Sequence, residues 1–185
     1  MKVIKILAVM ALLACAVSCG NRQKKAESEE PAAAEETQDM SKYMPGLKAG
    51  DTAPELEMNT PEGVLLKLSD FAGKWVVLDF WASWCPDCRA EFSAVKELYE
   101  AVSPKGVEFI GVSFDHEIDA WAKCLDEQLF PWPQVCNFIK WKENPVSEAF
   151  GIHWIPTMML IDPDGKVAGA ALTAEDMQAL LSSKL

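Results

Sequence analysis

Two cysteines, three residues apart, stand between a buried strand and a helix, and this arrangement constrains the chain more than any other feature. The run from Trp75 to Trp81 is apolar except for one aspartate, as in a strand covered on both faces. The segment Pro86–Val102 carries apolar side chains at helical spacing. Cys85 therefore lies at the helix start and Cys88 one turn later, close enough for their thiols to form a disulfide.

The position of Cys85 gives its thiol a particular chemistry. Free backbone N–H groups and the helix dipole point at it, and both favour the thiolate. We therefore predict that Cys85 attacks disulfides and that Cys88, deeper in the helix, resolves the mixed disulfide by attacking Cys85. Asp87 puts a negative charge beside Cys85, which opposes the thiolate and makes the disulfide less oxidising.

The other patterns predict one α/β domain around this unit, with parallel strands first and an antiparallel pair at the end. Two short alternating runs separated by a turn indicate an N-terminal hairpin. The predicted elements are a hairpin over 55–59 and 64–68, strands over 75–81, 107–114, 157–161 and 166–172, and helices over 86–102, 118–129 and from 173 onward.

The first eighteen residues have the features of a signal peptide. A short basic start precedes twelve small or apolar residues over 6–17, too few to cross a bilayer, which takes about 20. The small residues that lead into Cys19 resemble a bacterial lipobox, whose cysteine is acylated. Cleavage there leaves four thiols, an even number. Cys15 is an alternative lipobox cysteine, and a secretory signal without lipid is a further alternative.

The composition of residues 19–43 indicates a lipidated flexible tether. Residues 44–185 are then the folded domain. The tether has no aromatic residue before Tyr43, so it buries too little apolar surface to offset its ordering entropy. A short helix over 31–36 is the alternative. The net charge of −11 repels phosphate backbones and argues against nucleic acid as a partner.

Three segments resemble thioredoxin-fold oxidoreductases, in particular the membrane-anchored TlpA/ResA-like group, which is related to the AhpC/TSA proteins. The segment from Asp79 to Glu91 resembles their active site, Gly151–Thr157 resembles their cis-proline loop, and Gly50–Pro54 resembles their opening segment. The resemblance implies a thioredoxin-like fold, with a central mixed sheet flanked by helices and an N-terminal β-hairpin extension. It also implies a thiol-disulfide oxidoreductase that holds no metal and no cofactor.

The same resemblance implies roles for further residues. Asp79, six residues before Cys85, and Glu91, three after Cys88, are candidates to accept the Cys88 proton. Asp79 has little structural reason to sit in an apolar strand, whereas Glu91 fits a solvated helix position equally well. The residues implied to bind substrate are Trp84, Trp154, Ile155 and a cis Pro156.

Two alternative functions use the same cysteines. A peroxiredoxin-like thiol peroxidase would show Pro-x-x-x-Ser/Thr-x-x-Cys, and neither Cys85 nor Cys88 fits that pattern. A metal or cofactor carrier would need further ligands, and the two histidines, His116 and His153, are far apart in the sequence.

The expected setting is the bacterial cell envelope, with the protein lipid-anchored, monomeric and facing the periplasm. Its expected partners are protein disulfide substrates and a membrane electron donor. Cys124 and Cys136 form either a structural disulfide or two buried free thiols, since spacing alone gives no geometry.

Overall fold

The structure of the chain is a computed structural model, and it describes residues 40–185. The predicted signal peptide over 1–18, the predicted lipidation site Cys19 and the predicted tether up to residue 39 lie outside the described residues. Residues 40–43, which the sequence analysis assigns to the tether, form a 3-10 helix, Met40–Tyr43.

The strands are β1 (Glu57–Asn59), β2 (Leu65–Lys67), β3 (Trp75–Trp81), β4 (Val107–Ser113), β5 (Gln134–Cys136), β6 (Thr157–Ile161) and β7 (Val167–Ala171). The α-helices are α1 (Pro86–Val102), α2 (Ile118–Gln128), α3 (Pro145–Ala149) and α4 (Ala174–Ser182).

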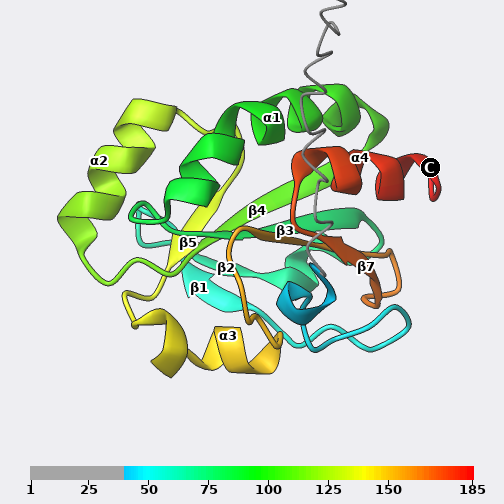
Figure 1. The fold of residues 1–185 in the computed structure, drawn as a ribbon, viewed down its shortest axis with the longest axis horizontal. Helices are drawn as coiled ribbons and strands as arrows, with labels where there is room; N and C mark the ends of the chain where they lie inside the picture. Colours follow the sequence, from blue (N-terminus) through cyan, green and yellow to red (C-terminus); the bar gives the residue numbers. More distant parts are fainter. Residues whose placement is uncertain (1–39) are drawn as a thin grey trace, which may run out of the picture. The chain divides into compact units, whose positions relative to one another are not determined.

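Five strands form one mixed sheet in the order β5-β4-β3-β6-β7 (Figure 1). β3 pairs in parallel with β4, and β4 in parallel with β5. On its other side β3 pairs antiparallel with β6, which pairs antiparallel with β7. The predicted thioredoxin-like fold is confirmed, and the strand that leads into the two cysteines lies at the centre of its sheet.

The N-terminal hairpin forms a separate two-stranded sheet. Met58 of β1 lies opposite Leu66 of β2, and both strands are three residues long, shorter than predicted. The turn between them is closed by the Thr60 N–H, which donates to the carbonyl oxygen of Val64 at 2.9 Å. Gly63 has a φ of +77° in this turn, a conformation that glycine adopts without steric cost.

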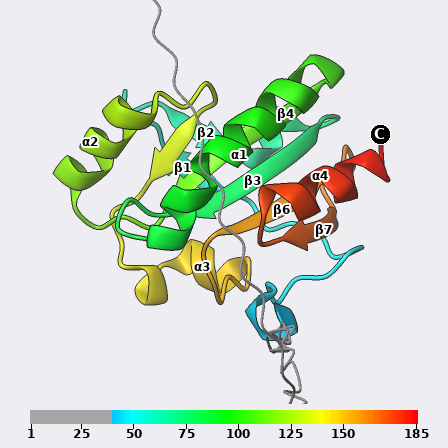
Figure 2. The ribbon, with the colours of Figure 1, turned by 45° about the horizontal axis from the view of Figure 1, so that its top comes forward.

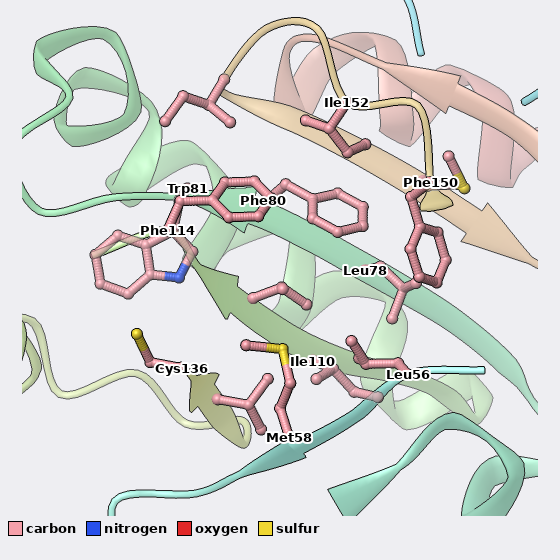
Figure 3. Close-up of a cluster of buried hydrophobic side chains, with 14 of the residues drawn as sticks. Leu56, Met58, Leu78, Phe80, Trp81, Ile110, Phe114, Cys136, Phe150 and Ile152 are labelled. Carbon is pink, nitrogen blue, oxygen red and sulfur yellow. The ribbon is translucent and has the colours of Figure 1, made fainter. Parts of the chain in front are cut away.

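The sheet is covered on both faces, as its apolar strands require. Figures 1 and 2 show α1 and α4 side by side over one face, with the hairpin and α3 on the opposite face. The first face is filled by residues such as Val77, Leu98 and Met177. The second is filled by Leu56, Leu78, Phe80, Ile110, Phe114 and Phe150 among others, and Figure 3 shows this cluster.

Among the strands and α-helices of residues 40–185, β5 and α3 were not predicted from the sequence. β5 is three residues long and follows Pro133, so no alternation marks it, and it becomes a strand through its parallel pairing with β4. α3 is five residues long and is capped by Asn144, whose side chain accepts the Val146 N–H at 3.0 Å. Within residues 40–185, no helix combines the length and the apolar character that crossing a membrane requires.

Candidate active site

The two cysteines lie where β3 passes into α1. Cys85 is the N-cap of α1, and Pro86 occupies the first turn, where its missing N–H is not needed. Cys85 and Cys88 are joined by a disulfide, with their Cα atoms 5.3 Å apart. The Cys88 N–H donates to the Cys85 Sγ at 3.1 Å. A backbone donor of the first helical turn therefore already points at the sulfur that would carry the thiolate.

Both sulfurs are recessed, since Cys85 is 4% exposed and Cys88 1% exposed. Cys85 is the more exposed of the two, because Cys88 lies one turn further into the helix. The assignment of Cys85 as the attacking thiol and Cys88 as the resolving thiol stays a prediction.

The loop before β6 approaches the disulfide from the other side. The Ile155–Pro156 peptide bond is cis, as the resemblance implies. The carbonyl oxygen of Ile155 lies 3.7 Å from the Cys85 Sγ. Thr157 holds the loop, because its Oγ1 donates to the carbonyl oxygen of Trp154 at 2.8 Å. Ile155 thus places a backbone carbonyl group next to the Cys85 sulfur.

Aromatic side chains lie around the site, and each contacts a partner from a distant part of the chain. Trp84 is 47% exposed, and its ring centroid lies 6.4 Å from that of Trp141. Trp141 is anchored by its Nε1–H, which donates to the carbonyl oxygen of Ile152 at 3.3 Å. Trp154 instead packs against Tyr43, with ring centroids 4.4 Å apart. Trp141 and Tyr43 were not predicted from the sequence, because each contact joins residues distant in the chain.

The contact between Tyr43 and Trp154 is part of a longer attachment. The Gly46 N–H donates to the carbonyl oxygen of Gly151 at 2.8 Å. Gly151 has a φ of +61°, and a Cβ at this position would lie 2.7 Å from the Gly46 nitrogen. The segment 43–46 is therefore fastened to the loop that leads to Pro156.

Asp79 lies on β3 and is 4% exposed. Side chains alternate along a strand, so Asp79 faces the same side as Val77, toward α1 and α4. Burial is the main cause that raises the pKa of the Asp79 carboxyl from 3.8 to about 7, and the nearby charge of Glu91 contributes to the same rise. A carboxyl group that titrates near neutral pH can take up and release a proton during the reaction.

Glu91 lies on α1 and is half-buried. Its Oε2 accepts the N–H of Ala174, the first residue of α4, at 2.9 Å. Glu91 thus satisfies a free backbone donor at the start of α4, in addition to its electrostatic effect on Asp79. This partner lies 83 residues away in the sequence. Glu91 is therefore not a fully solvated helix residue, which was the alternative that the sequence left open.

Cys124 and Cys136 are both free and buried, so of the two alternatives the structure has the free thiols. Cys136 belongs to the core cluster on the hairpin side, which Figure 3 shows. Burial raises the pKa of the Cys124 thiol and of the Cys136 thiol. Both are therefore held as thiols at neutral pH, and a thiol is a poorer nucleophile than a thiolate.

One buried residue near the site, Asp115, was missed in the sequence. It follows β4, and its carboxylate accepts hydrogen bonds from Ser83, two residues before Cys85. A polar residue at the carboxyl end of a strand that is parallel to β3 is the signal that could have revealed it. In the part of the chain that the structure describes, no three His, Cys, Asp or Glu side chains gather as a metal ion would require.

The sequence model of the AhpC/TSA family matches residues 49–170. A thiol-disulfide oxidoreductase ResA from Bacillus thuringiensis subsp. konkukian is 33% identical over 121 residues, which cover 65% of this chain and 68% of that protein. A thiol-disulfide oxidoreductase ResA from Geobacillus thermodenitrificans is 32% identical over 140 residues, which cover 74% and 78%.

Solved structures agree with this result. The thioredoxin domain of a thiol-disulfide oxidoreductase from Bacteroides vulgatus superimposes with a TM-score of 0.68 at 32% identity, over 75% of this chain and 98% of that one. A thiol:disulfide interchange protein from a Bacteroides species gives a TM-score of 0.66 at 31% identity, over 74% and 90%.

Proposed function

The chain belongs to the AhpC/TSA family and, within it, to the ResA-like thiol-disulfide oxidoreductases, and we propose that it reduces protein disulfides in the bacterial cell envelope. The observation that carries the proposal is the position of the Cys85–Cys88 disulfide, between the N-terminus of α1 and the carbonyl oxygen of Ile155. The N-terminus of α1 and the loop of Ile155 thus flank the Cys85 sulfur. The helix N-terminus favours the Cys85 thiolate, which is the nucleophile of disulfide exchange.

In the proposed reaction the Cys85 thiolate attacks one sulfur of the substrate disulfide, and the other sulfur leaves as a thiolate. Asp79 accepts the proton of Cys88, whose thiolate then attacks Cys85 in the mixed disulfide. The substrate leaves with both cysteines reduced, and the protein is left with its Cys85–Cys88 disulfide. Two electrons have passed to the substrate. The pKa of Asp79, at about 7, suits it to take this proton near neutral pH.

Charges around the disulfide support a reductant rather than an oxidant. Asp87 is exposed in the first turn of α1, and two further acidic residues, Asp79 and Glu91, belong to the strand and the helix that carry the disulfide. Arg89 is the only cation between Trp84 and Glu91, and it faces α2, where its Nη2 lies 3.7 Å from Glu127 and its Nη1 3.8 Å from Cys124. A less stable Cys85 thiolate makes the disulfide less oxidising.

The proposed setting is the envelope of a bacterium, on the periplasmic side. We propose that residues 1–18 are removed, that Cys19 carries lipid and that the segment after it tethers a monomeric domain near the membrane. Multiple acyl chains would hold the protein stably, because a single chain binds only marginally. A membrane electron donor would return the Cys85–Cys88 pair to its dithiol form after each turnover. The names of the ResA relatives support the chemistry of this proposal.

Substrate trapping tests the proposal. A Cys88→Ala protein can form a mixed disulfide through Cys85 but cannot resolve it, so it should accumulate covalent complexes with envelope proteins that dithiothreitol releases. The matched control is a Cys85→Ala, Cys88→Ala double variant, which should accumulate none. Equal amounts of complex in the two strains would overturn the assigned roles of the cysteines.

The reduction potential of the Cys85–Cys88 pair tests the proposed direction of electron flow. Equilibration with glutathione should give a value nearer that of thioredoxin, ~−270 mV, than that of DsbA, ~−120 mV. A value above about −180 mV, which is typical of an isomerase, would reject the reductase while leaving disulfide exchange in place.

A further inference from the structure

The turn between β3 and α1 is held from outside by one buried carboxylate, that of Asp115. The Ser83 N–H donates to the Asp115 Oδ2 at 2.9 Å, and the Ser83 hydroxyl donates to its Oδ1 at 2.6 Å. Asp115 is 1% exposed and lies just past β4, whose parallel partner is β3. Both donors of Ser83 are thus committed to the two oxygens of one side chain.

Asp115 is itself fixed by the end of β4. The Ser113 hydroxyl donates to the Asp115 Oδ2 at 2.7 Å, and the Asp115 N–H donates to the Ser113 Oγ at 2.9 Å. The next contact along the chain is a backbone bond, in which the Phe114 N–H donates to the carbonyl oxygen of Trp81 at 2.9 Å. The backbone of β4 therefore fixes the place of Asp115, and the Ser113 hydroxyl adds a further contact to its carboxylate.

The anchored residue lies in the middle of the active-site turn. The Cys85 N–H donates to the carbonyl oxygen of Ala82 at 3.2 Å, which closes a four-residue turn with Ser83 and Trp84 at its centre. The position of Ser83 therefore determines where the turn delivers Cys85. Hydrogen bonds to a charged acceptor are stronger than neutral ones, so this anchor is the strongest polar contact of the turn.

We propose that Asp115 is a positioning residue for disulfide exchange, which holds the turn through Ser83 so that the Cys85 sulfur stays directed at Cys88. The proposal rests on disulfide exchange at these two cysteines and not on the direction of electron flow. Asp115 acts through Ser83, and no contact between its carboxylate and either active-site sulfur is needed.

The anchor has a measurable effect on the redox equilibrium. Disulfide formation within one chain depends on the effective concentration of one thiol at the other, which falls when the chain that carries them is less restricted. In the dithiol form no bond joins the two sulfurs, so the local chain and its anchor on Asp115 keep Cys85 close to Cys88. Loss of the anchor therefore favours the dithiol form and moves the reduction potential upward.

Three serine substitutions separate positioning from plain stability. Ser83→Ala removes a hydroxyl donor from Asp115 on the side of the turn, whereas Ser113→Ala removes one from the same carboxylate on the side of β4. Ser83→Thr keeps the donor and is the conservative rescue. Each variant is equilibrated with glutathione at one pH, after circular dichroism shows that it is folded, and its reduction potential is compared with that of the unchanged protein.

The expected result is that Ser83→Ala makes the disulfide about tenfold less stable against glutathione, because the released turn lowers the effective concentration of the Cys85 thiol at Cys88. This change is about 30 mV upward for a two-electron couple. Ser113→Ala and Ser83→Thr should stay within about twofold of the unchanged protein, since the turn keeps its donors. Asp115→Asn should shift the equilibrium in the same direction as Ser83→Ala. If the Asp115→Asn protein does not fold, the serine variants decide the question.

A Ser83→Ala protein with an unshifted reduction potential, or an equal shift in Ser113→Ala, would overturn the proposal. Because only differences between variants are compared, this outcome is separate from the potential of the unchanged protein, which tests the reductase.

Discussion

Glu91 acts on Asp79 by charge while its own carboxylate is bound elsewhere. One Glu91 oxygen accepts the N–H of Ala174 at the start of α4, at 2.9 Å. After burial, the charge of Glu91 is the second cause that raises the pKa of Asp79, to about 7. The protonation of the buried carboxyl group is therefore linked to the end of a helix that makes no contact with substrate in the proposed reaction.

Asp79→Asn should stabilise the protein at neutral and alkaline pH. The folded-state pKa of Asp79, about 7, lies above its ordinary value of 3.8, so the folded protein binds this proton more tightly than the unfolded chain. Asp79 therefore makes the free energy of unfolding fall as pH rises from about 4 to about 7, by at most about 1.4 kcal/mol per pH unit. The variant should lose this slope and unfold at higher urea above pH 7. Exposed Asp126→Asn should keep the slope, and a slope that survives in Asp79→Asn would contradict the assignment.

The same substitution should slow resolution of the mixed disulfide more than its formation. Only resolution requires Cys88 to lose its proton, and a positioned base contributes on the order of 100-fold or more. Stopped-flow measurement with a disulfide peptide separates the two steps, and the rate of resolution in the unchanged protein should rise through pH 7. If Asp79→Asn slows both steps equally, or slows neither, Asp79 is not the base.

Glu91→Gln and Glu91→Ala separate the two effects of Glu91. Glutamine keeps an oxygen for the Ala174 N–H but has no charge, so the pKa of Asp79 should fall and the rise of the resolution rate should move below pH 7. Alanine should in addition lower the free energy of unfolding by about 1 kcal/mol, because α4 loses an acceptor at its first turn. Identical unfolding curves for the two variants would show that the bond to Ala174 adds no stability.

Asp87→Asn should make the disulfide more oxidising. The substitution removes one negative charge beside Cys85 without changing the shape of the helix start, so the thiolate is stabilised and the reduction potential rises. Asp87 is exposed, so the shift should be small and should shrink in about 1 M salt, where charges are screened within ~3 Å. A downward shift, or one that salt leaves unchanged, would exclude charge as the cause.

Cys19→Ser should release the protein from membranes or leave it unprocessed. The substitution removes the proposed site of acylation, which the lipobox-like residues before it indicate. Fractionation of cells and the mass of the mature protein measure both effects, with Cys15→Ser as the matched control at the alternative cysteine. Unchanged processing and unchanged membrane association in Cys19→Ser would reject lipidation at this residue.

The elements around the cysteines were predictable because their patterns are local. The ranges 75–81, 86–102 and 157–161 agree with β3, α1 and β6 residue for residue. A continuous apolar run and helical spacing each carry enough information within one segment. The sequence of β5 carries too little information to predict a strand, because β5 is three residues long and depends on β4 for its pairing.

The site was predictable as far as its residues are close in sequence. The cysteine pair and Asp79 belong to one strand–turn–helix unit, and the cis Pro156 was implied by resemblance. The contacts of Glu91 with Ala174, of Trp154 with Tyr43 and of Ser83 with Asp115 all join distant parts of the chain. No local pattern encodes these partners, since each follows from how the finished sheet brings segments together.

The close approach of Gly46 and Gly151 has a consequence for protein engineering. A side chain on Gly151 would collide with the Gly46 backbone, and Tyr43 covers the ring of Trp154. The two segments therefore form one transferable unit, although more than a hundred residues separate them. A chimaera that grafts this redox domain onto another carrier needs its junction ahead of Tyr43. A junction after Gly46 would pair the loop that leads to Pro156 with a foreign segment, and would alter the substrate-facing side of the enzyme without touching either catalytic cysteine.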